Sequence, residues 1–173
     1  MGSYYYLMSS LPDLSADAEA PIGYEEFLNM CESNVSDGTL DQLRQLTPSQ
    51  PAGCIASEWT AFCGVLNKEL NSQRSARLGK PYPQGYEKEP EASAAAAAAL
   101  AARNPLEAEK IILKFQFEQL DRILGLHMFD EEALFCYAMK LRLLERAGRF
   151  EHDKGKKEFT KLFEQVQKSI RGV

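Results

Sequence analysis

The sequence lacks the short motifs that most often signal an enzyme. It has no glycine-rich phosphate loop, no Walker A lysine, no HExxH zinc motif and no GxSxG nucleophile elbow. Its two histidines, His127 and His152, each lie close to an aspartate (Asp130 and Asp153), and such a pair could serve acid–base chemistry. Both pairs fall in predicted turns between helices, where histidine is commonly solvated or capping. We therefore expect a protein that is not an enzyme, with no catalytic residue, no metal and no cofactor.

Cysteine is also sparse. The four cysteines at positions 31, 54, 63 and 136 form no CxxC pair and have no neighbouring histidine, so neither a zinc site nor a disulfide framework is indicated. Cys136 sits in a strongly apolar stretch, where a free buried thiol is the usual state.

No long hydrophobic run is present. The start of the chain lacks a basic segment followed by an apolar one, so we expect no signal peptide. The longest apolar run is an alanine tract, which is too short and too weakly hydrophobic to span a bilayer. A cytoplasmic location without a direct membrane span is the simplest interpretation.

The composition is that of one ordinary folded domain. The chain has 173 residues, 45% of them hydrophobic, and a net charge of −5. The charge is uneven: residues 1–53 carry −7, residues 54–139 carry −3 and residues 140–173 carry +5. An acidic chain without a basic stripe interleaved with aromatics is a poor nucleic-acid binder. The basic end is either a set of solvated helix faces or a docking surface, in which Arg142, Arg146, Arg149 and Lys156 would contact a partner.

Residues 104–170 read as three consecutive helices. Asn104 is placed to cap the first helix, with Pro105 at its first position and Glu107 reaching back to the cap. Apolar residues at spacings of three, four and seven predict one buried stripe on it: Leu106, Leu113, Phe117, Leu120 and Leu124. Asp130 caps a second helix, apolar on nearly every side, that ends at Gly148. The third carries Phe159, Leu162, Phe163, Val166 and Ile170 on one face.

The first half of the chain predicts shorter elements. The aromatic stretch 4–8 reads as an extended segment that packs on the body, with helix as the alternative. Helices are expected at 24–33, at 39–46 with Thr39 as cap, and from a cap at Ser57 to near Gly79. A proline-rich loop at 80–90 precedes the alanine tract 92–102, which we expect to form a helix. This helix is either a spacer or a close-packed contact with a partner helix.

These elements predict a mainly α, bundle-like domain with a short N-terminal segment that is either extended or helical. We divide it into an N-terminal helical region (1–80), a proline-rich loop with an alanine-rich helix or spacer (81–103) and a C-terminal three-helix region (104–173). One compact domain is expected overall.

Three patches of the sequence resemble a known family. They are YYYLMSSLPDL at residues 4–14, with YEEFL at 24–28 and Cys31; residues 59–79, with NKEL at 67–70, Arg74 and Arg77; and NPLEAE at 104–109, leading to HMFD at 127–130 and Tyr137. Together they are similar to a bacterial family of unknown function whose members are encoded with the subunits of V/A-type ATPases. The last patch, through Phe129, Tyr137, Glu145 and Arg146, more faintly resembles the C (eukaryotic d) subunit of these ATPases.

The resemblance implies a role without chemistry. The C subunit is an all-helical socket that joins the central stalk to the membrane rotor. The implied function is a non-catalytic structural or coupling subunit of an ion-transporting ATPase, attached to the membrane through the complex, with stalk or rotor subunits as partners. The alternative is a general helical adaptor for protein–protein interaction, unrelated to ATPases.

Overall fold

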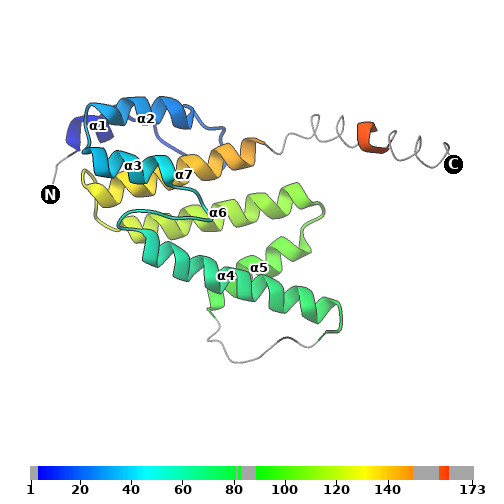
Figure 1. Cartoon of the computed structure of the whole chain (residues 1–173). Coiled ribbons are helices and arrows are strands. Elements are labelled where there is room, and N and C mark those ends of the chain that lie inside the picture. The colour runs from blue at the N-terminus through cyan, green and yellow to red at the C-terminus, as the bar shows by residue number, and fades with distance from the viewer. Residues whose placement is uncertain (1–3, 81, 83–88, 150–159, 164–173) are drawn as a thin grey trace.

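The chain folds into an all-helical body. The computed structural model describes residues 4–80, 82, 89–149 and 160–163, and its helices are labelled in Figure 1. They are α1 (Tyr5–Ser10), α2 (Tyr24–Glu32), α3 (Asp37–Gln45), α4 (Ala56–Arg77), α5 (Pro90–Ala101), α6 (Pro105–Leu124) and α7 (Glu131–Gly148). A further turn of helix lies at residues 160–163. The described part contains no strand, only an isolated bridge between Thr47 and Gln50, so the expected mainly α fold is confirmed.

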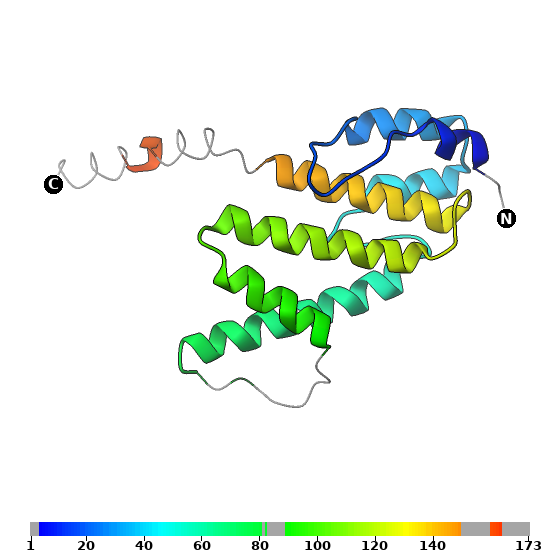
Figure 2. The ribbon, with the colours of Figure 1, turned by 180° about the vertical axis from the view of Figure 1, so that it is seen from behind.

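The helices stack in layers around α6 and α7, as Figures 1 and 2 show from opposite sides. The short helices α2 and α3 pack on each other, and α2 covers one side of α7. Helix α6 runs along the other side of α7, and the pair α4–α5 packs against the far side of α6. Helix α1 lies at the end of the body near the turn between α6 and α7, because the Tyr4 amide donates to the Phe129 carbonyl at 2.8 Å. The two ends of α7 therefore face opposite ends of the molecule.

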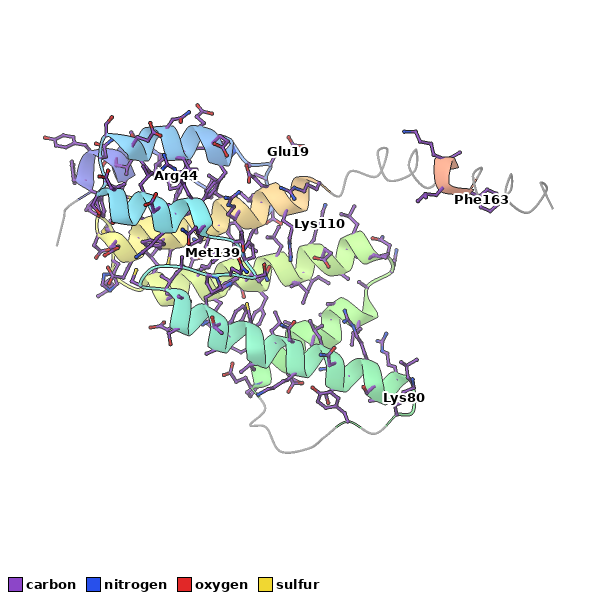
Figure 3. All side chains as sticks on the ribbon, viewed as in Figure 1. Glu19, Arg44, Lys80, Lys110, Met139 and Phe163 are labelled. Carbon is purple, nitrogen blue, oxygen red and sulfur yellow. The ribbon has the colours of Figure 1, made fainter. Side chains whose placement is uncertain are left out.

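Helix α7 is the centre of the core, as its apolar sequence predicts. Asp130 caps it through Oδ1, which accepts from the Ala133 amide at 3.1 Å. Met139 is labelled inside the body in Figure 3. The buried residues of α7 are Ala133, Leu134, Phe135, Cys136, Ala138, Met139, Leu141, Leu143 and Leu144. Neighbouring layers cover this helix on several sides, which explains why its sequence shows no clear polar face.

Helix α6 begins as predicted, with one shift in its cap. Asn104 Oδ1 accepts from the Glu107 amide at 2.8 Å, while the Glu107 carboxylate accepts from the Arg103 amide at 3.1 Å, one residue before the cap. The helix ends at Gly125, whose φ of +52° favours glycine. One prediction for this helix is wrong. Leu106, assigned to the buried stripe, is 41% exposed, because it faces a groove beside the end of α7.

Three predictions for the first half of the chain also need correction. The stretch expected to be extended forms helix α1, in which Leu7 is buried. Helix α3 is capped by Ser36, whose Oγ accepts from the Thr39 amide at 3.2 Å, so Thr39 lies inside the helix. Helix α4 starts at Ala56 with no side-chain cap, which places Ser57 inside it. Helices α3 and α4 thus begin about two residues earlier than their predicted caps indicate, a common error at helix ends.

The linker between α3 and α4 crosses closely over α7. Gly53 has a φ of +74°, and a Cβ atom placed there would lie 2.5 Å from the Phe135 ring. Both the backbone conformation and the close approach require glycine at this position.

The alanine tract is a packed helix of the body. Ala92, Ala96 and Ala99 are buried, and α5 lies against both α4 and α6. Small side chains let the three helix backbones approach closely, so the tract makes the close-packed contact within its own chain.

Polar side chains of the neighbouring helices also hold α5. Gln73 Nε2 donates to the Ser93 carbonyl at 2.9 Å, and Arg77 donates to the Leu100 carbonyl at 2.5 Å. Arg122 of α6 forms an ion pair with Glu91 at the start of α5.

Two predicted segments fall largely outside the described residues. Of the predicted third C-terminal helix, only residues 160–163 are described, and they are helical. Of the proline-rich loop, only Lys80, Tyr82, Glu89 and Pro90 are described.

Candidate interaction surfaces

Arg142, the first predicted contact residue, packs against other residues of the helical body. Its guanidinium carbon lies 3.4 Å from the centre of the Tyr24 ring, and its Nε donates to the Leu46 carbonyl at 3.1 Å. Its Nη1 lies 3.5 Å from Glu145 Oε2, and the other oxygen of that carboxylate accepts from the Tyr24 amide at 2.8 Å. Arg142 and Glu145 thus tie α7 to α2 and to the end of α3. Only 22% of the Arg142 side chain is exposed, so it offers little surface to a partner.

The other predicted contact residues lie at the C-terminal end of α7. Arg146 reaches Glu109 of α6 at 3.4 Å, and Arg149 follows the last turn of the helix and is exposed. Lys156 lies outside the described residues. The structure therefore brings Arg146 and Arg149 to one exposed end and places Arg142 one layer deeper.

A groove opens at this end of the molecule. It has a volume of about 600 Å³ and lies between the first turns of α6, the last turns of α7 and the loop at residues 16–20. Its apolar side is made by Leu106, Leu113 and Leu144. Its polar residues are Asp17, Glu19, Glu109, Lys110, Glu145 and Arg146. Figure 3 shows Glu19 and Lys110 on either side of the end of α7. We call this feature the acidic groove, since carboxylates outnumber cations in its lining.

A second surface lies at the opposite end of α7. Here α1 meets the turn between α6 and α7, with the Tyr5 and Phe129 rings 4.7 Å apart and the Tyr5 and Tyr6 rings 5.6 Å apart. Next to them, Leu126 is 98% exposed, Tyr6 is 85% exposed and Met128 is 66% exposed. We call Tyr5, Tyr6, Leu126, Met128 and Phe129 the apolar tip.

The apolar tip gathers much of the exposed apolar surface of the body. Outside the turn at 160–163, the described residues expose six large hydrophobic side chains, and four of these belong to the tip. Single exposed leucines are ordinary, but a cluster of them with tyrosine and methionine has the composition of a protein–protein contact. The Leu126 and Met128 side chains bury little apolar area in the body, so folding gains little from them.

The predicted His127–Asp130 pair is present at the base of the tip. His127 Nδ1 lies 2.5 Å from Asp130 Oδ2 and 3.9 Å from Glu132 Oε2. The hydrogen bond with Asp130 raises the pKa of His127 above its ordinary value of 6.5. The ligand atoms of these three residues lie within 4.8 Å of one another, close enough for a metal ion. However, Asp130 is the cap of α7, and the positive end of the helix dipole opposes a cation there. The arrangement supports capping better than catalysis or metal binding.

The described cysteines offer no activated nucleophile. Cys31 and Cys136 are free and buried, as expected for Cys136, and burial raises the pKa of both thiols to about 12. The reactive thiolate form is therefore disfavoured.

The apolar tip was missed by the sequence analysis. The tyrosines at 5 and 6 were expected to pack on the body, yet Tyr6 projects into water. A signal for the tip was present, since Gly125 ends α6 and is followed at once by Leu126 and Met128, two large apolar residues in a predicted turn. For the acidic groove, the sequence offers no signal beyond the uneven distribution of its charged residues.

Comparison with known families gives a match for part of the chain. A helical bundle with two exposed contact surfaces defines no activity by itself. Residues 97–170 match a family model described as "Protein of unknown function (DUF2764)". The expected resemblance to a family of unknown function is thus confirmed for this part of the chain, which covers α6, α7 and the end of α5. The description of that family mentions no ATPase.

Other comparisons add no relative: neither a curated protein nor a solved structure matches the chain. Within the described residues, every helix is too short or too polar to cross a bilayer.

Proposed function

We propose that this chain is a non-catalytic helical connector that works by binding other proteins. The apolar tip is the observation that carries the proposal, since it exposes Tyr6, Leu126 and Met128 at one end of a well-packed body. Exposed aromatic and methionine side chains bind partners by losing water contact, and tyrosine often dominates such interfaces. Such a surface requires no bond-making chemistry.

The partner class follows from the resemblance to proteins encoded with V/A-type ATPases. We propose that the connector is a structural or coupling subunit of such an ATPase, comparable to the C subunit between stalk and rotor. A socket of this kind needs a stiff body and charged rims that orient docking. Arg149, exposed at the end of α7 opposite the tip, would supply one rim charge. Through the complex, the protein would be held at the membrane surface.

The test is affinity purification of the full chain from its native membrane fraction, followed by mass spectrometry. The proposal predicts that ATPase stalk or rotor subunits are enriched with the wild-type chain and lost with the double variant Leu126→Asp and Met128→Asp. Leu78→Asp is the matched control, because Leu78 is 70% exposed at the end of α4 and lies outside the tip.

The alternative function, a general adaptor, makes a different prediction in the same experiment. Proteins unrelated to ATPases would then be enriched and lost with the same tip variant. An unchanged set of bound proteins in the tip variant would reject both functions at this surface. Arg149→Glu tests the rim charge separately, and ATPase co-purification that does not change would remove Arg149 from the contact.

A further inference from the structure

The acidic groove lies beside the point where the chain leaves the body. Gly148 lines the groove, and Arg149 follows as the last described residue of this part of the chain. We propose that the acidic groove binds the C-terminal segment, residues 150–173, of a second copy of the chain, and that two copies exchange these segments reciprocally. This inference does not depend on the proposed ATPase partner, whose main contact surface, the apolar tip, lies at the opposite end of α7.

The apolar parts of the groove and the segment match in kind. Leu106 is 41% exposed in the first turn of α6, although the stripe to which it belongs is otherwise buried or half-buried. The segment carries Phe159, Leu162, Phe163, Val166 and Ile170 at helical spacing. In the described turn, Leu162 is 59% exposed and Phe163 is 53% exposed. An amphipathic helix laid into an apolar groove is a common recognition mode.

The charges are complementary as well. The groove lining has four carboxylates and two cations, and Asp17 and Glu19 stand on its outer loop. Residues 150–173 contain six lysines and arginines and four acids. In addition, Arg146 Nε is buried without a hydrogen-bond partner among the described residues. A carbonyl or carboxylate of an incoming segment would satisfy this donor, which is otherwise costly to bury.

The geometry favours a second copy over the same chain. The turn at residues 160–163, where Phe163 is labelled in Figure 3, lies beyond the end of α7 and away from the body in Figures 1 and 2. To enter its own groove, the segment would have to turn back toward the last turns of α7 that it has just left. A second copy needs no such reversal. Because groove and segment are neighbours, a two-fold axis beside the groove places each segment at the other copy's groove and closes the assembly as a dimer.

The test is the solution mass of the full chain, measured by light scattering during size-exclusion chromatography over a range of concentrations. We expect a species of twice the 19.4 kDa of one chain. The segment variant Leu162→Asp with Phe163→Asp, and separately the groove variant Leu106→Asp, should each weaken self-association by about tenfold or more, since both bury a charge at an apolar contact. Leu78→Asp should leave the dimer unchanged.

Mixing the two defective variants sharpens the test. The segment variant keeps an intact groove and the groove variant keeps an intact segment, so reciprocal exchange predicts that the mixture regains association through one intact pair. A wild-type chain that stays monomeric at about 100 μM would overturn the proposal, because such weak association lies below that of specific interfaces. A dimer that persists in both variants would overturn it too. The tip variant should leave the dimer intact, so a loss of ATPase co-purification with an intact dimer, or the reverse, identifies which proposal fails.

Discussion

Helices α5 and α7 both pack inside the body, but different contacts hold them there. Helix α7 buries nine residues, including Leu134, Phe135 and Met139, and so removes a large apolar area from water. Helix α5 buries only three alanines, which contribute little area. Its position depends on close backbone approach and on polar links from α4 and α6. A helix can therefore be buried either by large apolar side chains or by small side chains that let neighbouring helices approach closely.

The difference predicts opposite responses to substitution. Replacing a large buried side chain of α7 by a small one should destabilise the fold, because it leaves a cavity. Replacing a buried alanine of α5 by a large residue should also destabilise it, because the space there admits only small side chains. The following predictions test this contrast, with the largest expected effect first.

The largest effect is expected from a cavity in α7. Phe135→Ala removes a fully buried ring and should lower the free energy of unfolding by about 3–5 kcal/mol. Urea denaturation followed by circular dichroism measures this change. Leu126→Ala, at a side chain that is 98% exposed, is the control and should change stability by less than about 0.5 kcal/mol. Similar losses for the two variants would contradict the central position of α7.

The complementary change adds volume to α5. Ala96→Leu places three extra carbons at a fully buried position and should cost about 1–3 kcal/mol through overpacking. Ala97 is the matched control on the exposed face of the same helix, where leucine should be tolerated within about 0.5 kcal/mol. If both variants are equally stable by urea denaturation, α5 is a spacer after all.

Polar links should matter more on α7 than on α5. Arg142→Ala leaves the Leu46 carbonyl without this donor and the Glu145 carboxylate without its cation, and should cost about 1–2 kcal/mol. Arg77→Ala removes an exposed link to the Leu100 carbonyl and should cost less than about 1 kcal/mol. Thermal unfolding of the two variants gives the comparison. A larger loss for Arg77 would show that polar links, and not alanine packing, hold α5.

The smallest effect concerns the start of α7, which has a side-chain cap that α5 lacks. The pKa of His127 is raised by its hydrogen bond to Asp130, so protonated His127 stabilises the fold. This contribution is fully present below the ordinary pKa of 6.5 and is lost as the pH rises through the higher pKa of the folded state. NMR titration should show a His127 pKa above 6.5 that falls in Asp130→Asn. If the pKa of His127 is unchanged in Asp130→Asn, the hydrogen bond with Asp130 does not raise it.

Much of this fold could be predicted from local chemistry. The caps Asn104 and Asp130 and the terminator Gly125 lie where their side chains or backbone freedom place them. The apolar sequence of α7 also predicted its central position. Predictions from local sequence were wrong where contacts with distant residues determine the structure. The aromatic N-terminal stretch is helical where it docks on Phe129. Leu106 is exposed because α7 ends beside it.

The candidate surfaces were less accessible from the sequence. The charge distribution in the sequence predicts a basic C-terminal surface. It does not distinguish Arg142, which stacks on Tyr24, from Arg149, which is exposed. That distinction depends on which helix covers which face. The apolar tip combines residues about 120 positions apart in the sequence. Only the folded chain brings Tyr6 and Met128 to one end of the molecule.

Hydrogen exchange of the complex recovered from native membranes tests the central claim most directly. If the chain is a connector that binds through its apolar tip, amides at residues 4–10 and 125–130 should exchange more slowly in the complex than in the free protein. The control region is the end of α4 around Leu78, where exchange should be equal in both. Unchanged exchange at the tip, with protection elsewhere, would contradict this account.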